Sequence, residues 1–287
     1  MLDKAKVLKI IRATLKEDIG AGDITTSVTV PRLESVKASI VAGEDFVLCG
    51  IGIAEWVINS VDYSVRFKPQ AKDGQRIYKG KEIAFLEGHA RAILSAERTM
   101  LNFLCFLSGI ATNVNKFVEK TKKYGVKIYD TRKTFPLLRY LEKYAVEIGS
   151  GHNHRFGLWD QVLVKDNHLQ AIRRKPQAIS EVLKEVRKKV QKNIKIEIEV
   201  TNLKEFEDAI KGKPDIIMLD NMNAGDVKKA VNLRAKKAPK KKPLLEVSGG
   251  INIDNVEKYA GTGVDRISVG SLTDSVESID MSLEINA

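Results

Sequence analysis

The chain has 287 residues, of which 43% are hydrophobic and 30% charged, and its formal net charge is +11. This composition suits one large α/β domain or two domains with a sizeable core. No uninterrupted apolar run approaches the roughly 18 residues that cross a bilayer, and the N-terminus lacks the apolar region of a signal peptide. We therefore expect a cytoplasmic protein without a membrane partner, whose charge points to acidic small molecules or nucleic acid.

The first 109 residues predict an α+β domain. A helical pattern over residues 3–17 is followed by mixed strands with glycine turns at 74, 80 and 88, and then by a long helix over residues 90–122. In that helix Arg98 falls within an apolar stripe, where its side chain would snorkel to solvent, pair with a buried carboxylate, or reach a second subunit packed on the stripe. We expect residues 273–287 to pack back onto this domain.

Residues 110–272 alternate apolar strands with amphipathic helices, which predicts parallel strands joined by crossover helices. A closed barrel of this kind has eight strands, and about seven are visible here. The fold class is therefore α/β, with an N-terminal α+β sandwich domain and an open, incomplete (β/α) barrel. The predicted strands cover residues 126–130, 146–149, 161–165, 194–200, 215–219, 244–248 and 265–270.

Basic side chains follow two of these strands, at the ends where barrel enzymes carry their active face. Arginine offers a planar fork for carboxylate or phosphate and lysine a point charge, so a set with both suits a substrate with several anionic groups. A solvated basic surface is the alternative. The candidate residues of this anion site are Thr131, Arg132, Lys133, His154, Arg155 and Lys165.

Two further strands end in carboxylates, Glu199 and Asp220. Strand alternation puts Glu197 on the same side as Glu199, one layer deeper in the barrel. The carboxylates could hold Mg²⁺, bind hydroxyl groups or stabilise positive charge. The alternative is a structural ion pair with Lys133 or Lys165.

The last two strands carry a phosphate-binding pattern. Ser248, Gly249 and Gly250 follow one strand, and Val269, Gly270 and Ser271 follow the next. Glycine permits close approach of a ligand to backbone N–H groups, a helix expected to start near Asp254 would add a favourable dipole, and barrel phosphate sites form at this position. The two loops together predict a phosphate site.

Several motifs together resemble the quinolinate phosphoribosyltransferase family, also called carboxylating nicotinate-nucleotide pyrophosphorylases. The resemblance implies a pentosyltransferase of NAD biosynthesis. Such an enzyme makes nicotinate mononucleotide, CO₂ and pyrophosphate from quinolinate and phosphoribosyl pyrophosphate, with Mg²⁺. The motifs occur in order along nearly the whole chain, at residues 17–26, 96–99, 107–112, 130–134, 151–155, 165–168, 219–221 and 248–250.

The resemblance also implies roles for single residues. Arg132, Lys133, His154, Arg155 and Lys165 would surround the two carboxylates of quinolinate. Arg98 would come from the adjacent subunit of a homodimer with shared active sites, which could assemble further into a hexamer. Glu199 and Asp220 would face the ribose and its metal, and Lys133 or Lys165 would protonate the ring after decarboxylation. The 5-phosphate would bind at Ser248, Gly249, Gly250 and Gly270.

One departure from the family pattern stands at Phe135 and Leu137, where we expect Thr and Gly. Two other functions remain open. A related phosphoribosyltransferase, acting on nicotinate or serving a molybdenum-associated operon, should lack the second-carboxylate set that includes His154 and Arg155. A basic nucleic-acid-binding protein would need an exposed basic stripe with stacking aromatics. The basic clusters at 173–175, 187–189 and 234–242 lack such aromatics and predict solvated faces.

Overall fold

The computed structural model describes residues 2–172, 178–237 and 243–286. They form two compact units. The first comprises residues up to 115, residues 134–150 and residues from 275 onward, and the second comprises residues 116–133 and 151–274. Residues 134–150, which we assigned to the barrel from the sequence, therefore belong to the first unit.

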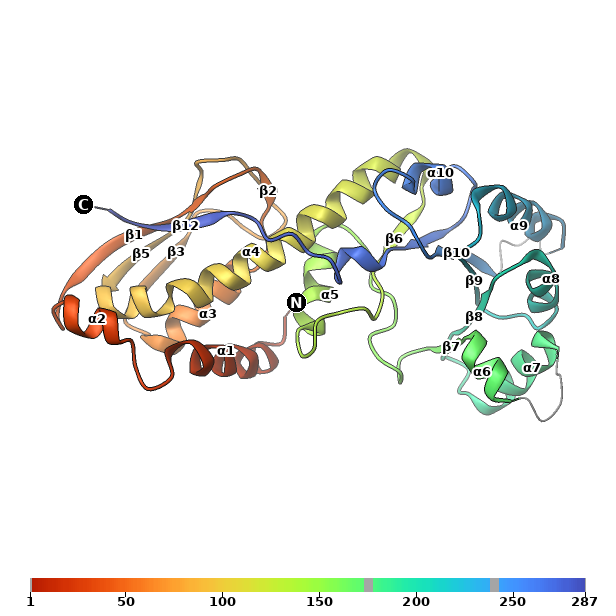
Figure 1. The fold of residues 1–287 in the computed structure, drawn as a ribbon, viewed down its shortest axis with the longest axis horizontal. Helices are drawn as coiled ribbons and strands as arrows, with labels where there is room; N and C mark the ends of the chain where they lie inside the picture. The colour runs from red at the N-terminus through yellow and green to blue at the C-terminus, as the bar shows by residue number, and fades with distance from the viewer. Residues whose placement is uncertain (1, 173–177, 238–242, 287) are drawn as a thin grey trace. The chain divides into compact units, whose positions relative to one another are not determined.

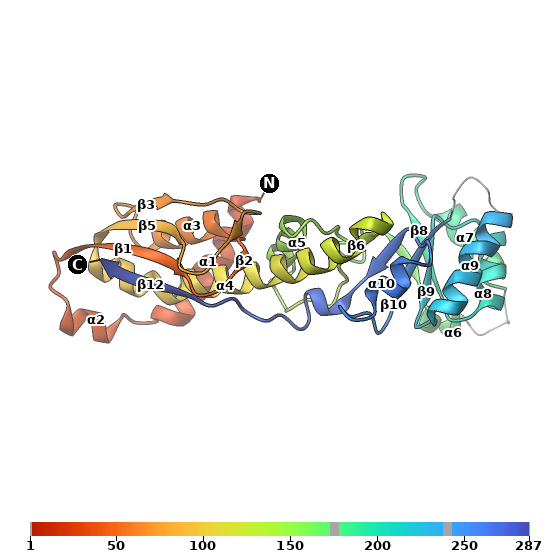
Figure 2. The same cartoon turned by 90° about the horizontal axis from the view of Figure 1, so that it is seen from above.

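An antiparallel sheet with helices on one face makes up the first unit (Figures 1 and 2). The strand order is β12-β1-β5-β3, so the C-terminal strand pairs with β1. The strands are β1 (Ser35–Ala42), β3 (Arg66–Pro69), β5 (Glu82–His89) and β12 (Met281–Asn286), with a separate pair β2 (Phe46–Val47) and β4 (Arg76–Ile77). The helices are α1 (Lys4–Ile19), α2 (Ile24–Thr29), α3 (Ile51–Val61), α4 (Ala90–Thr121) and α5 (Arg139–Ile148).

Helix α1 shows how local sequence sets these elements. The carboxylate of Asp3 accepts hydrogen bonds from the backbone N–H groups of Ala5 and Lys6 and so caps the helix. Val7, Ile11 and Leu15 are spaced four residues apart and are buried. Because this spacing places them on one face, the helix packs against the rest of the unit.

Helix α4 is long and apolar enough to cross a membrane by length and average composition, although Arg91, Glu97 and Arg98 interrupt its apolar sequence. The stretch that meets this criterion is 61% buried inside the protein. Met100, Leu104 and Leu107 are fully buried, as in the central helix of a protein core. Its burial accounts for its hydrophobicity.

The strand predicted at residues 146–149 is wrong, because residues 146–148 form the last turn of α5. Leu141, Ala145 and Val146 are buried at helical spacing. A short apolar run ending in glycine fits a strand or a helix end equally well, and only the longer helical period separates the two.

The second unit is an open parallel sheet of six strands in its described residues, ordered β6-β11-β10-β9-β8-β7. This confirms the incomplete barrel, with one strand fewer than predicted. The strands are β6 (Lys127–Tyr129), β7 (Val162–Val164), β8 (Ile196–Val200), β9 (Ile216–Asp220), β10 (Leu244–Ser248) and β11 (Arg266–Ser268). The helices are α6 (Asp166–Ala171), α7 (Ile179–Lys189), α8 (Leu203–Lys211), α9 (Ala224–Lys237) and α10 (Val256–Ala260), with 3₁₀ turns at Lys122–Tyr124 and Gly270–Leu272.

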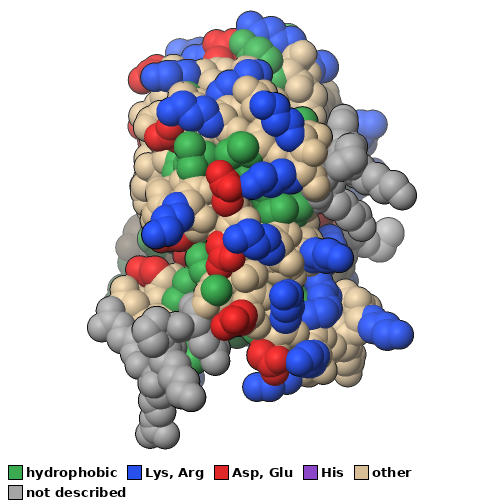
Figure 3. Space-filling model, turned by 90° about the vertical axis from the view of Figure 1, so that its right-hand side faces the viewer, with side chains coloured by type: hydrophobic (Ala, Val, Ile, Leu, Met, Phe, Trp, Pro, Cys, Tyr) green, Lys and Arg blue, Asp and Glu red, His purple; other side chains and the backbone are tan. Residues whose placement is uncertain are grey.

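The outer face of the second unit carries many Lys and Arg side chains with acidic side chains between them (Figure 3). Ion pairs one helical turn apart contribute to the mixture, with Lys188 2.7 Å from Glu185 and Lys229 2.8 Å from Asp226. Residues 173–175 and 240–242 of the predicted basic clusters lie outside the described residues. Elsewhere in these helices, interspersed charges are typical of a solvated surface rather than a polyanion site.

Candidate active site

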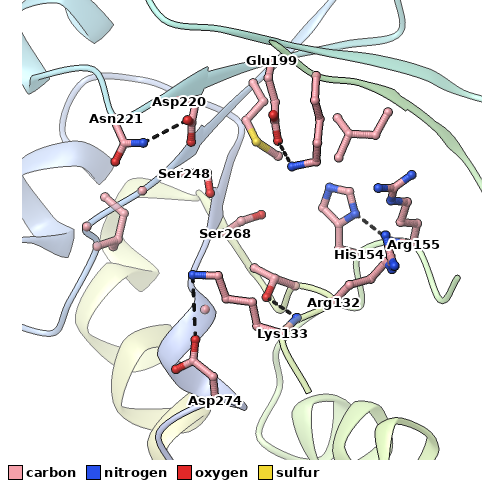
Figure 4. A pocket seen from close by; sticks show the side chains of 18 of the residues that line it. Arg132, Lys133, His154, Arg155, Glu199, Asp220, Asn221, Ser248, Ser268 and Asp274 are labelled. Atoms are coloured by element: carbon pink, nitrogen blue, oxygen red, sulfur yellow. Dashed lines mark hydrogen bonds and ion pairs between the residues drawn. The ribbon is translucent and has the colours of Figure 1, made fainter. Parts of the chain in front are cut away.

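A cavity of about 800 Å³ opens at the carboxyl ends of the parallel strands of the second unit. All of its lining residues belong to this unit. In Figure 4, Arg132, His154 and Arg155 lie toward one end of the cavity and Asp220 with Ser248 toward the other. Parallel strands create this arrangement because their carboxyl ends meet on one side of the sheet.

All but two of the site residues predicted from the sequence line this cavity, the exceptions being Val269 and Arg98. Val269 is fully buried, and its N–H donates to the carbonyl of Tyr129 at 3.0 Å, so the sheet uses that donor. Arg98 belongs to the first unit and is exposed, lining another cavity with Phe106 and Met281. Because Arg98 is exposed within this chain, its charge can be hydrated and does not need a buried carboxylate.

Two guanidinium groups form the cationic end. Arg155 is only 8% exposed, and its Nη1 donates to the carbonyl of Gln161 at 3.3 Å. Burial, and after it the positive charge of Arg132, lower the pKa of Arg155. Like charges in a shielded pocket are favourable only when an anion balances them. The charges of Glu197 and Glu199 oppose this shift, and two guanidinium groups on the wall suit an anionic ligand.

The two lysines of the site are held differently. Lys165 forms an ion pair with Glu199. The side chain of Lys133 is 73% exposed, and its Nζ lies 3.9 Å from Asp274. The backbone of Lys133 is fixed, because its carbonyl accepts a hydrogen bond of 2.6 Å from the hydroxyl of Thr273. Lys133 thus combines an anchored backbone with a side chain that can turn toward a ligand.

Glu199 faces the middle of the cavity, and Asp220 faces it near the end that holds Ser248 (Figure 4). The sequence left open whether Glu199 pairs with a lysine or serves a ligand, and its position allows both. Burial raises the pKa of Glu199 and the charge of Asp220 raises it further, although Lys165 opposes them. Two carboxylates that repel each other at a cavity wall favour a cation between them.

Beneath the cavity lies a buried layer of charged side chains. Nε2 of His154 is 3.1 Å from Glu197 and 3.3 Å from Glu246, and both carboxylates are fully buried. Arg266 lies 3.3 Å from Glu246, and Ser268 hydrogen-bonds the same carboxylate. Burial of Glu197 one layer below Glu199 confirms the alternation expected for that strand.

The protonation of His154 has opposing determinants. Burial disfavours the charged ring and lowers the pKa of His154. The hydrogen bonds and negative charges of Glu197 and Glu246 outweigh burial and raise this pKa to about 10. The backbone N–H of Arg155, however, donates to Nδ1 at 2.7 Å. A nitrogen that accepts a hydrogen bond carries no proton, so this contact assigns the ring proton to Nε2. Because both ring nitrogens contact the protein, His154 presents mainly the carbon atoms of its ring to the cavity.

The cluster of His154, Glu197 and Glu246 has the ligand types and spacing of a metal site. Arg266 already neutralises Glu246, and the amide of Gln161 donates to Glu197, so the group functions as a hydrogen-bonded ionic layer. Sequence reasoning missed Glu246, although it precedes Ser248 by two residues just as Glu197 precedes Glu199. The same alternation would have found it.

The phosphate loops differ in detail from our expectation. Gly249 and Gly250 have φ angles of 93° and 64°, which favour glycine. Helix α10 has only five residues and starts at Val256, so its dipole adds little. Gly270 begins a 3₁₀ turn that includes Ser271, and both residues line the cavity. The loops therefore offer backbone N–H groups and two serine hydroxyls rather than a helix end.

Both parts of the chain are similar to known proteins. The family described as "Quinolinate phosphoribosyl transferase" matches over residues 23–108 with its N-terminal domain and 110–284 with its C-terminal domain. The chain is 43% identical over 286 residues to the "Probable nicotinate-nucleotide pyrophosphorylase [carboxylating]" of Methanocaldococcus jannaschii, covering 98% of each. It is 40% identical to the corresponding Mycobacterium leprae protein, covering 96% and 95%. A nicotinate-nucleotide pyrophosphorylase structure from Francisella tularensis has a TM-score of 0.91 at 39% identity, covering 100% of this chain and 98% of that one.

Proposed function

The chain belongs to the quinolinate phosphoribosyltransferase family, and from this premise we propose how its cavity transfers phosphoribosyl to quinolinate. The enzyme converts quinolinate and phosphoribosyl pyrophosphate into nicotinate mononucleotide, CO₂ and pyrophosphate, a pentosyl transfer in NAD biosynthesis. The observation that carries the proposal is the division of one cavity into an end with two guanidinium groups and an end with glycine loops, with Glu199 between them and Asp220 beside the glycine loops.

At the cationic end, the two carboxylates of quinolinate bind between Arg132, Arg155 and the lysines. Arginine can bind a carboxylate through two parallel N–H contacts, which fixes the plane of the acid. The ring of His154 forms part of the wall, and Thr131 accepts the N–H of Lys133 at 3.1 Å, which shapes the turn. A substrate with one carboxylate would leave part of this charge unbalanced.

At the other end, Ser248, Gly249, Gly250, Gly270 and Ser271 bind the 5-phosphate. This position leaves the anomeric carbon of the sugar beside Glu199 and Asp220. When the ring nitrogen attacks that carbon and pyrophosphate departs, positive charge develops on the sugar, and these carboxylates stabilise it. No protein nucleophile is required.

We assign a Mg²⁺ site to Glu199 and Asp220, because repelling carboxylates that share one cavity are the oxygen donors this ion prefers. When bound, the ion offsets the negative charge of the departing pyrophosphate. Transfer gives the ring nitrogen a positive charge, and this charge stabilises the electron pair left on the adjacent ring carbon when the carboxylate there leaves as CO₂. A lysine ammonium, from Lys133 or Lys165, then supplies the proton to the ring carbon.

The decisive assay measures CO₂ release from carboxyl-labelled quinolinate with and without phosphoribosyl pyrophosphate, together with nucleotide formation from nicotinate. Quinolinate should be strongly preferred, because losing a charge-assisted contact to a buried carboxylate costs roughly 2–5 kcal/mol. Similar kcat/KM values for the two acids would refute the assignment and favour a nicotinate enzyme. We propose a cytoplasmic location.

We also propose a homodimer in which Arg98 enters the partner's cavity, with further assembly to a hexamer allowed. Arg98 supports this because it is an exposed cation on the mainly buried helix α4, outside its own chain's acid site. Arg98→Ala and Arg132→Ala should each be nearly inactive. Random 1:1 mixing places one intact site in half of the dimers, so roughly a quarter of wild-type activity should return. If mixed dimers form without activity, the shared site is wrong.

A further inference from the structure

Asn221, the residue that directly follows β9, has a strained backbone at the cavity. Its φ of 53° lies in the left-handed region, which is unfavourable for residues other than glycine. Asparagine tolerates this region better than most residues, but the conformation persists only where surrounding contacts impose it. Asn221 lines the cavity, so the strain lies at the site itself.

The contacts of Asn221 join two parts of the site. Its backbone N–H donates to the carbonyl of Ser248 at 2.9 Å, which ties the end of β9 to the end of β10. Its side-chain Nδ2 donates to Oδ2 of Asp220 at 2.9 Å (Figure 4). One residue therefore connects the phosphate loop to the carboxylate that faces the sugar.

Gly249 makes room for this side chain. A Cβ at position 249 would lie 2.2 Å from Oδ1 of Asn221 and 3.0 Å from its backbone nitrogen. At Gly250, in contrast, no atom lies within 4 Å of the corresponding position. The two glycines thus have separate reasons: Gly249 accommodates the carboxamide of Asn221, and Gly250 keeps its face open.

We propose that Asn221 is a positioning residue for the phosphoribosyl end of the site. It acts through Asp220, whose carboxylate it holds in one orientation, and Gly249 is required so that its carboxamide can lie there. The inference rests on the proposed function, because the ligand it serves is a sugar carrying a 5-phosphate and a pyrophosphate with a divalent cation. Fixing the carboxylate beforehand removes an ordering cost when this ligand binds.

Replacement of Asn221 tests this directly. Asn221→Gly accepts the same backbone angle but loses the amide, and Asn221→Asp keeps the shape but places a negative charge beside Asp220. Contacts that orient a metal-binding group typically change affinity or activity by about 10–100-fold. We expect kcat/KM for phosphoribosyl pyrophosphate to fall by that factor while the quinolinate KM stays unchanged. The midpoint of thermal unfolding of Asn221→Gly should stay within roughly 2 °C of wild type.

Asn223→Ala provides a matched control two residues away. Asn223 caps α9 by accepting the N–H of Asp226 at 3.0 Å, so its loss should lower stability without affecting phosphoribosyl pyrophosphate kinetics. If Asn221→Gly behaves like this control, Asn221 is only structural. Equal losses for both substrates would also overturn the proposal.

A double-mutant cycle tests the role of Gly249. Gly249→Ala should be severe in the wild-type background and milder, though still harmful, with Asn221→Gly, since the Oδ1 contact is then absent while the φ of 93° and the 3.0 Å approach to the backbone nitrogen of residue 221 remain. Independent, multiplicative effects on kcat/KM would contradict the shared space. Calorimetric binding of phosphoribosyl pyrophosphate with Mg²⁺, measured without quinolinate, separates this inference from the proposed reaction. Weaker binding to Asn221→Gly than to wild type supports the inference even if CO₂ release fails, and equal binding overturns it.

Discussion

The two ends of the same parallel strands treat charge in opposite ways. At the amino ends, Arg234 pairs with Asp265 and Arg187 with Asp215. Each aspartate also accepts a hydrogen bond of 2.8 Å from a backbone N–H of the neighbouring strand, Asp265 from Leu245 and Asp215 from Ile196. Each arginine also donates to a backbone carbonyl, that of Pro243 or Ile194. These repeated clamps satisfy opposite charges and join a helix to two strands.

At the carboxyl ends, groups of like charge line one cavity, although Lys165 forms an ion pair with Glu199 there. Burial and then the charge of Arg132 lower the pKa of Arg155, burial and to a smaller extent Asp220 raise that of Glu199 against Lys165, and Asn221 has a strained backbone. Such an arrangement gains little stability by itself and becomes favourable when a ligand supplies the opposite charge. We infer that the amino ends hold the sheet together and that the carboxyl ends are shaped for substrates. Four predictions test this division, from the largest effect to the smallest.

The largest effect should follow from Glu246→Ala, in the buried layer between the two ends. Removing the carboxylate leaves the guanidinium of Arg266, a residue that is 8% exposed, without its ion-pair partner. Loss of one member of a buried pair costs roughly 3–5 kcal/mol, and we expect about 4 kcal/mol from urea unfolding. The quinolinate KM should also rise, because Glu246 contacts His154.

Glu246→Gln keeps the shape and serves as the companion variant if Glu246→Ala does not fold. It should retain part of the stability and still raise the quinolinate KM. An unchanged quinolinate KM in this variant would show that the buried layer stabilises the sheet and has no role in substrate binding.

Asp265→Ala should destabilise by roughly 3 kcal/mol without affecting catalysis. The side chain of Arg234 is only 8% exposed, so it cannot regain full hydration after losing Asp265. The N–H of Leu245 loses its acceptor as well. Unfolding in urea gives the stability, and assays well below the unfolding temperature give kcat and KM. A changed KM would break the proposed separation of the two ends.

Sequence reasoning found the rim of the site because strand ends are visible in the sequence. Glu199, Asp220 and Ser248 each lie at or one residue before the end of a strand, and parallel strands bring such ends together. Arg234 was instead interpreted as part of a solvated cluster, since its pairing with Asp265 joins residues 31 positions apart. The backbone angle of Asn221 depends on its contact with Ser248, which no local pattern reports. The final turn of α5 was mistaken for a strand because four residues cannot establish a period.

Glu199→Gln and Asp220→Asn should lower kcat by roughly 100-fold, about 2.7 kcal/mol of activation free energy, because each removes charge that stabilises the developing cation. Their stability should change by less than about 1 kcal/mol, since the side chain of Lys165 is 40% exposed and can return to water. Calorimetry of quinolinate binding serves as the control. Abolished quinolinate affinity in a folded variant would mean that these carboxylates organise the acid end instead.

The smallest effect should come from Asp215→Ala, which removes the same kind of clamp as Asp265→Ala. Both side chains of the Arg187–Asp215 pair are 36% exposed, whereas Arg234 and Asp265 are 8% and 24% exposed. Exposed ion pairs contribute roughly 0–1 kcal/mol because water solvates the separated charges, so we expect a loss of about 1 kcal/mol, including the lost acceptor of Ile196. Urea unfolding of both variants in the same buffer measures the contrast. Equal losses would show that the backbone contacts of the aspartates, rather than burial of the arginines, stabilise the amino ends.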